Sequence, residues 1–98
     1  MFAVIYRWRI EPEMEDQFRD GWGRVTRAIR ARCGSYGSRL HRSADGLWVA
    51  YARWPDARLR EQCEHDEVEG RRLMREAVAE HYPDITVEIT DDLLAEPR

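Results

Sequence analysis

The segment from Leu47 to Trp54, LWVAYARW, constrains the fold of this 98-residue chain more than any other, because it is apolar on both faces. Side chains of a β-strand point alternately to the two faces of a sheet. A strand with one face in water should therefore alternate apolar and polar residues. Here one face would carry Trp48, Ala50, Ala52 and Trp54, and the other would carry Leu47, Val49 and Tyr51, interrupted only by Arg53. Both faces of this strand need a cover.

The N-terminal third of the chain predicts a strand followed by a helix. Residues 2–9, FAVIYRWR, are rich in β-forming residues and end before the break signal Glu11-Pro12. Over residues 13–32, apolar side chains recur at steps of three and four, which predicts a helix; they are Met14, Phe18, Trp22, Val25 and Ile29. Gly34 is well placed to end this helix in a left-handed conformation.

The middle of the chain predicts a β-hairpin and a short helix. Residues 35–42 and 47–54 would pair around a turn at Ala44-Asp45-Gly46. Pro55-Asp56 then opens a short helix over about 57–64. The second helical unit is thus predicted to begin directly after the hairpin.

The C-terminal third predicts a further helical segment and a last strand. Asp66 followed by Glu69 resembles a capping box and would start the segment, whose apolar members are Val68, Leu73, Met74, Ala77 and Val78. Pro83 follows, and DITVEIT predicts the final strand, with Ile85, Val87 and Ile89 on one face.

The element order β-α-β-β-α-β predicts an α+β fold of the ferredoxin-like type, with a four-stranded antiparallel sheet and helices on one face. We expect one domain over residues 1–98, with a core over 2–90 and an acidic tail over 91–98. The helices cover one sheet face, and no segment remains for the other. A second copy packed sheet to sheet, giving a homodimer, is the favoured cover. A patch that docks a different protein is the alternative.

Composition narrows the classes of partner. The formal net charge of −3 gives no general attraction to nucleic acid or anionic lipid. The sequence has no apolar run of 18 residues, so no membrane span is expected, and MFAVIYRWRI is interpreted as a strand rather than a signal peptide. Cys33 and Cys63 form no CxxC pair and are expected to be reduced thiols of a cytoplasmic protein.

Familiar catalytic motifs do not occur in the sequence, and no metal site is predicted. Glu64-His65-Asp66-Glu67 contains residues of the types that bind metals, but adjacent helical residues point to different sides, so a cap at a helix junction is favoured.

The sequence is rich in aromatic residues, and these are the remaining candidates for a functional site. A missing side chain at Gly21, with Ala50 and Ala52 opposite, would leave a cavity between helix and sheet, and ordinary packing of large and small residues is the alternative. The candidate binding residues are Tyr6, Trp22, Trp48 and Ala50, together with Trp54.

The stretch GSYGSRLHRSADGLWVAYARWPDARL resembles the antibiotic biosynthesis monooxygenase family of the dimeric α/β-barrel superfamily. AVIYRWRIEPEMEDQF and the strand ending in ARWPD carry the same resemblance, which covers about residues 2–90. It implies the ferredoxin-like fold and the dimer. Reactions in this superfamily include oxygenation, haem degradation, isomerisation and decarboxylation.

Two subgroups can be compared residue by residue. Quinone-forming members, which use oxygen without metal, flavin or haem, have a Trp and an Arg that match Trp54 and, allowing one inserted residue, Arg75. Their Asn falls on Ala50 and their Tyr on Leu59 or Arg60, so half of the constellation is absent. The haem-degrading subgroup needs Asn, Trp and His where this chain has Tyr6, Cys63 and Leu73. Haem degradation is therefore not expected.

The resemblance and the residues together favour a cofactor-independent monooxygenase that oxidises a small aromatic or quinol with molecular oxygen. In this hypothesis Arg75 holds the oxyanion, Trp54 and Tyr6 orient the ring, and His65 is the base. A non-catalytic dimer that binds a small aromatic molecule, and an isomerase or decarboxylase on the same scaffold, are the alternatives.

Overall fold

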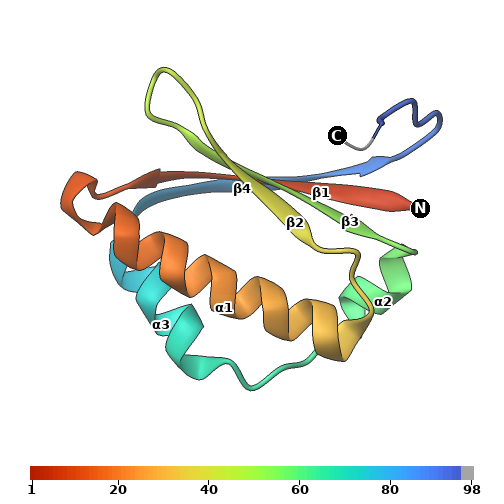
Figure 1. Cartoon of the computed structure of the whole chain (residues 1–98), viewed down its shortest axis with the longest axis horizontal. Coiled ribbons are helices and arrows are strands. Elements are labelled where there is room, and N and C mark those ends of the chain that lie inside the picture. Colours follow the sequence, from red (N-terminus) through yellow and green to blue (C-terminus); the bar gives the residue numbers. More distant parts are fainter. Residues whose placement is uncertain (96–98) are drawn as a thin grey trace.

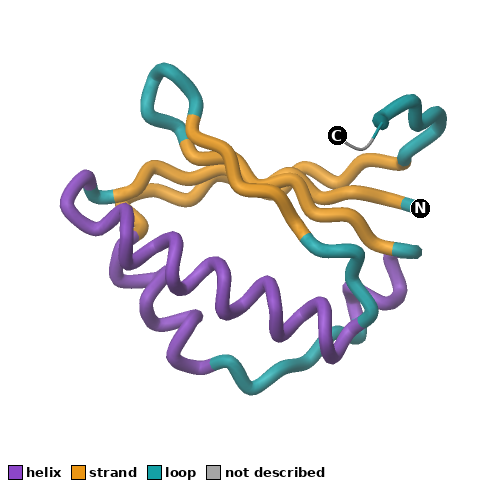
Figure 2. Tube along the Cα trace, viewed as in Figure 1, coloured by secondary structure: helices purple, strands orange, loops and turns teal. Residues whose placement is uncertain are grey.

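A computed structural model describes residues 1–95 and shows one four-stranded antiparallel sheet with all helices on one face (Figures 1 and 2). The strand order is β2-β3-β1-β4, so β1 and β3 are central. The α+β, ferredoxin-like prediction is confirmed. The elements are β1 (Phe2–Ile10), a 3₁₀ turn (Pro12–Met14), α1 (Glu15–Cys33), β2 (Ser38–Arg42), β3 (Trp48–Trp54), α2 (Ala57–Glu61), α3 (Val68–Ala77) and β4 (Val78–Glu88).

The two-faced segment of the sequence is the central strand β3, as its pattern requires. Its helix-facing residues are all buried: Trp48, Ala50, Ala52 and Trp54. Large residues stand beside small ones across the ladder, since Tyr6 of β1 pairs with Ala50. Phe18 of α1, fully buried, packs edge-on against the rings of Trp8 and Trp48, with centroids 5.1 and 5.8 Å away. These contacts form the core between α1 and the sheet.

Gly21 has a different role from the one predicted, because it faces α3 rather than a cavity. A Cβ atom at Gly21 would lie 2.7 Å from the backbone oxygen of Gly70 and 2.9 Å from Cβ of Leu73. A Cβ at Gly70 would in turn lie 3.0 Å from Cγ2 of Val25. The two glycines let α1 and α3 approach closely, a contact that a side chain at either position would prevent.

The helix ends agree with the sequence in part. Gly34 ends α1 with φ of 75°, as predicted, and Asp56 caps α2 by accepting the N–H of Leu59 at 2.9 Å. The predicted Asp66 cap is wrong, because α3 begins at Val68 without a side-chain cap. Instead, Nδ1 of His65 accepts the backbone N–H of Glu67 at 3.2 Å and closes the turn before the helix.

The last strand begins earlier than predicted. β4 starts at Val78, directly after α3, and Pro83 lies inside it. β4 is an edge strand, and its register with β1 shifts between Ile5 and Arg7, opposite the proline. An edge strand with an irregular ladder tolerates a residue that has no N–H to donate.

Cys33 and Cys63 form a disulfide, so the expectation of two reduced thiols is wrong. Their Cα atoms lie 5.2 Å apart, and the bond joins the last residue of α1 to the loop after α2. Sequence spacing alone does not reveal this proximity. Disulfides are typical of oxidising compartments. The expectation of a cytoplasmic protein was based on two reduced cysteines, and the structure does not support that basis.

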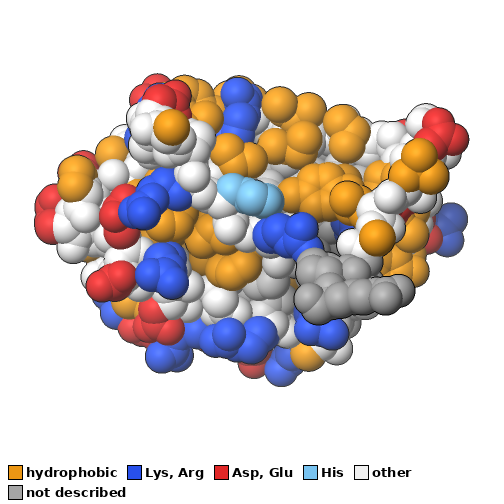
Figure 3. Space-filling model, turned by 45° about the horizontal axis from the view of Figure 1, so that its top comes forward, with side chains coloured by type: hydrophobic (Ala, Val, Ile, Leu, Met, Phe, Trp, Pro, Cys, Tyr) orange, Lys and Arg blue, Asp and Glu red, His pale blue; other side chains and the backbone are white. Residues whose placement is uncertain are grey.

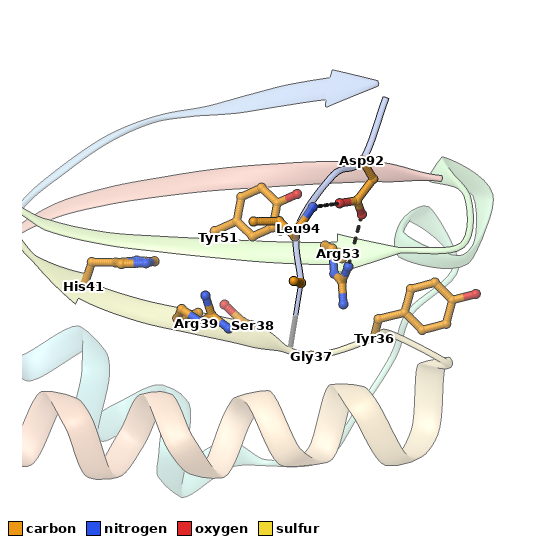
Figure 4. A pocket seen from close by; sticks show the side chains of 10 residues that line it. Tyr36, Gly37, Ser38, Arg39, His41, Tyr51, Arg53, Asp92 and Leu94 are labelled. Atoms are coloured by element: carbon orange, nitrogen blue, oxygen red, sulfur yellow. Dashed lines mark hydrogen bonds and ion pairs between the residues drawn. The ribbon is translucent and has the colours of Figure 1, made fainter. Parts of the chain in front are cut away.

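The outer face of the sheet, opposite the helices, has only a partial cover. Hydrophobic side chains gather across it in Figure 3, and Ile85 and Val87 are 41% and 37% exposed. The residues that follow β4 turn back over β3, where Asp92 lies 3.6 Å from the guanidinium of Arg53 (Figure 4). Within the described part of the chain, no helix has the length and apolar character needed to cross a membrane.

Candidate functional site

A cavity of about 170 Å³ lies between α1 and the sheet, on the helix-facing side of β3. Its aromatic walls are Tyr6, Trp8, Trp22 and Trp54. The other lining residues are Val25, Thr26, Ile29, Ser35, Ser38, Ala52 and Met74. A mainly apolar hollow with a few polar groups is the usual form of a small-molecule site, and this volume suits a ligand of one or two rings.

The local sequence explains why space remains there. On β3, Ala52 has only a methyl side chain between Ala50 and Trp54, so space remains between this part of the strand and α1. On α1, Trp22, Val25 and Ile29 recur at steps of three and four and form the roof. Trp54 closes one end, where β3 stops before Pro55.

Two buried polar atoms in this lining have no hydrogen-bond partner among residues 1–95: Nε1 of Trp54 and Oγ of Ser38. Trp54 is only 3% exposed. A neighbouring hydroxyl differs, because Ser35 Oγ donates to the carbonyl of Arg53 at 3.3 Å and accepts the N–H of Gly37 at 2.9 Å. Leaving a buried donor unpaired costs roughly 1–3 kcal/mol, so the Trp54 indole is a natural donor for a ligand oxygen.

A groove of about 370 Å³ adjoins the cavity and shares Trp8 and Met74 with it. Arg75 and His81 also line this groove. The imidazole of His81 stacks on Trp8 with ring centroids 5.8 Å apart, and its Nε2 lies 3.5 Å from Oδ1 of Asp84. Sequence reasoning missed His81, because the segment that carries it was not recognised as a strand.

The structure brings only some of the predicted site residues together. Tyr6, Trp22 and Trp54 line the cavity, and Arg75 lies in the adjoining groove. Trp48 packs at the other end of β3, where its Nε1 donates to Glu15 at 3.2 Å. Ala50 is buried in the core, and His65 lies in the loop before α3, outside both linings.

The outer face of the sheet holds another hollow, of about 480 Å³ (Figure 4). Tyr51 and Arg53 of β3 and Arg39 and His41 of β2 line it, and the residues after β4 cross it, including Leu94. Its lining mixes charged and apolar side chains, and it lies where a second sheet would pack. We therefore take the tryptophan-walled cavity as the candidate site. Within residues 1–95, no three His, Cys, Asp or Glu side chains form a group suited to a metal ion.

The pKa of His65, the predicted base, lies below its ordinary value. Partial burial is the main cause, and the positive charge of Arg71 contributes. His65 is therefore largely neutral near pH 7, and its Nδ1 is free to accept the Glu67 N–H. This hydrogen bond gives His65 a structural role at the start of α3.

Lowering the pH from 7 to 5 is expected to decrease the free energy of unfolding partly through His65. Because its pKa is lower in the folded state, the unfolded chain binds the proton more readily, and stability rises with pH through this range. In urea titrations, His65→Gln should show a shallower decrease, because glutamine binds no proton in this range, while its amide oxygen can still accept the Glu67 N–H. His41→Gln, on β2, is the matched control. An unchanged slope in His65→Gln would contradict the expectation.

The comparisons with known proteins show the fold. No family model matches the chain, and no curated protein matches it significantly. Among solved structures, Rv0793 from Mycobacterium tuberculosis is 21% identical, with 95% of this chain and 98% of that chain covered and a TM-score of 0.74. An antibiotic biosynthesis monooxygenase is 18% identical (93% and 100% covered, TM-score 0.73). SnoaB, a cofactor-independent oxygenase from Streptomyces nogalater, is 14% identical (94% and 95% covered, TM-score 0.75). The chain thus has the fold of the antibiotic biosynthesis monooxygenases that its sequence resembles.

Proposed function

We propose that this protein is a cofactor-independent monooxygenase that oxidises a small, electron-rich aromatic molecule, a phenol or quinol, with molecular oxygen. The observation that carries the proposal is the aromatic cavity, whose lining includes Trp54 with a buried indole N–H that has no partner among residues 1–95. A hydrogen-bond donor in an apolar site stabilises a phenolate more strongly than it would in water.

The chemistry asks little of the protein. A phenolate is electron-rich enough to reduce oxygen, so the site must bind the ring, favour loss of the phenolic proton and stabilise the anion. For a substrate of the 1-naphthol type, the ring C–H para to the hydroxyl becomes a carbonyl and the hydroxyl becomes the second carbonyl; one oxygen atom of O2 enters the quinone and the other leaves as water with the two hydrogens that the substrate loses. Tyr6 and Trp22 would hold the ring, and Trp54 would donate to its oxyanion.

The roles of Arg75 and His65 are less direct than those of Trp54. Arg75 would act from the adjoining groove, across the shared Trp8 and Met74. His65 lines neither hollow, so a role as base requires it to receive the proton through solvent. His81 lies beside Arg75 in the groove and is the nearer histidine in that arrangement.

One observation favours a second candidate function, a non-catalytic protein that binds a small aromatic molecule. Apart from the phenol of Tyr6, no titratable side chain belongs to the cavity lining among the described residues. Such a cavity can bind an aromatic ring although its lining supplies no other acid or base for a reaction. An isomerase or decarboxylase on this scaffold has no comparable support in the lining.

Oxygen consumption separates these functions. The purified protein, incubated under ¹⁸O2 with a panel of one- and two-ring phenols such as 1-naphthol, is expected to consume oxygen with at least one of them and to give the corresponding quinone with one labelled oxygen atom by mass spectrometry. Quenching of tryptophan fluorescence without oxygen consumption would instead identify a binding protein. Loss of substrate without oxygen consumption would identify an isomerase or decarboxylase.

We also propose a homodimer through the outer face of the sheet. Exposed Ile85 and Val87 and the apolar outer side chains of the central strands support it, because a monomer rarely leaves such a surface in water. Sedimentation velocity at micromolar concentration is expected to give twice the mass of the chain, and Ile85→Arg is expected to give the mass of one chain. A single-chain mass for the unmodified protein would contradict the proposal.

A further inference from the structure

A broad groove of about 710 Å³ runs between α1 and the edge strand β2 and continues from the aromatic cavity. The two hollows share Trp22 and Ser38, so a molecule whose ring occupies the cavity can extend past these residues into the groove. The groove has a strongly basic lining: Arg19 and Arg27 from α1, and Arg39, His41 and Arg42 from β2.

This concentration of positive charge is unusual in a chain whose formal net charge is −3. Two of the four arginines have partners: Arg42 lies 3.3 Å from Glu15, and Arg19 lies 3.6 Å from Asp16. Arg27 and Arg39 have no carboxylate within 4.0 Å in the described part of the chain. Arg39 pairs in register with Tyr51 and also lines the hollow on the outer face, so Arg27 of α1 is the group with which an anion on the helix side can pair.

Gly23 explains how Arg27 is held at the groove. A Cβ at Gly23 would lie 3.2 Å from Nη1 and 3.5 Å from Nη2 of Arg27, one turn further along α1. Gly23 is part of the groove lining, and because it has no side chain, the Arg27 guanidinium can pack directly against the helix backbone there. A glycine inside a helix costs about 1 kcal/mol relative to alanine, and this contact gives that cost a function.

Ser38 marks the junction of the two hollows. Its Oγ is buried and has no hydrogen-bond partner among residues 1–95, although it borders both the cavity and the groove. A carboxylate that extends from the cavity toward Arg27 would pass Ser38, and a small rotation of this side chain would let the hydroxyl donate to it.

We propose that the ligand of this site is an aromatic acid, with its ring in the tryptophan-walled cavity and its carboxylate in the groove, paired with Arg27 of α1. This inference rests on the proposed function, because it names the class of molecule that the same cavity takes. A planar carboxylate matches the fork of a guanidinium and forms two parallel hydrogen bonds with it.

Two matched probes test the inference by quenching of tryptophan fluorescence at pH 7: 2-naphthol and 6-hydroxy-2-naphthoate, which differ only in the carboxylate. We expect the acid to bind about fivefold more tightly, because Arg27 is exposed and an exposed ion pair is worth up to about 1 kcal/mol, where 1.4 kcal/mol corresponds to a factor of ten. Arg27→Gln should weaken binding of the acid about fivefold and leave binding of 2-naphthol unchanged. Arg30→Gln, on the same helix but outside the groove lining, is the control and should bind both probes normally.

The outcomes are distinguishable. Equal affinity for the two probes, or equal losses in Arg27→Gln and Arg30→Gln, would overturn the aromatic-acid inference while 2-naphthol binding still supports the cavity. Binding of neither probe would overturn the inference and remove the support of the proposed function as well. Loss of both probes in Arg27→Gln, with an unchanged circular dichroism spectrum, would also overturn the inference, because the effect would not be specific to the carboxylate.

Discussion

Trp54→Phe is expected to lower kcat/KM for oxidation of a phenolic substrate by about a hundredfold, the usual effect of removing one donor to a developing oxyanion. The substitution keeps an aromatic ring at the end of β3 and removes the only indole N–H of the cavity lining that is buried without a partner among residues 1–95. The phenolate then loses its hydrogen bond in an apolar site, where that bond is strongest. Initial rates of oxygen consumption across substrate concentrations measure the effect.

Trp48→Phe is the matched control for this prediction. Trp48 lies on the same face of the same strand, but its N–H already donates to Glu15; it borders the basic groove and not the cavity that holds the phenolic ring. Its kcat/KM should stay within a few-fold of the unmodified protein after correction for the folded fraction. Equal losses in the two variants would contradict the role given to Trp54, because the loss would then reflect general repacking of the core.

Gly21→Val is expected to lower the free energy of unfolding by about 3 kcal/mol, at the upper end of the usual cost of overpacking. Even a Cβ at this position would lie 2.7 Å from the backbone oxygen of Gly70, an atom that cannot move without moving α3. A branched side chain must separate the two helices. Because α3 also supplies Met74 to the cavity, the variant should bind 2-naphthol more weakly as well. Urea titration and fluorescence quenching measure the two effects.

Gly23→Ala, two residues further along α1, is the control. The three atoms nearest to a Cβ at this position all belong to the flexible Arg27 guanidinium, which can move aside. The variant should therefore be more stable by up to about 1 kcal/mol, the difference in helix propensity. A similar loss of stability at both glycines would contradict the assignment of Gly21 to the helix–helix contact.

The fold was predictable because its strongest signals are local. The alternation of β3 and the spacing of Phe18 and Trp22 fix which faces are buried, and Gly34 fixes the end of α1. The start of β4 was not predictable in the same way. Residues 78–82 are strand because they pair with β1 at the sheet edge, a tertiary contact that their own sequence does not indicate.

The candidate site was predictable only in part, for a geometric reason. Periodicity tells which face of β3 meets the helices, but not where along that face the helices leave a gap. Trp48 and Trp54 share the face, yet α1 fills the end at Trp48 with Phe18 and leaves the end at Trp54 hollow. The function of Gly21 and the pairing of Cys33 with Cys63 likewise depend on how distant segments meet.

The disulfide has a consequence for how a ligand enters. It closes a covalent ring from Cys33 to Cys63, and this ring contains the whole β2–β3 hairpin and α2. Ser35, Ser38, Ala52 and Trp54 all belong to the ring, so this side of the cavity is tethered to the end of α1. Met74, on α3, belongs to no such ring. Breathing motions that admit a ligand should therefore originate on the α3 side, while the Trp54 side acts as a fixed frame.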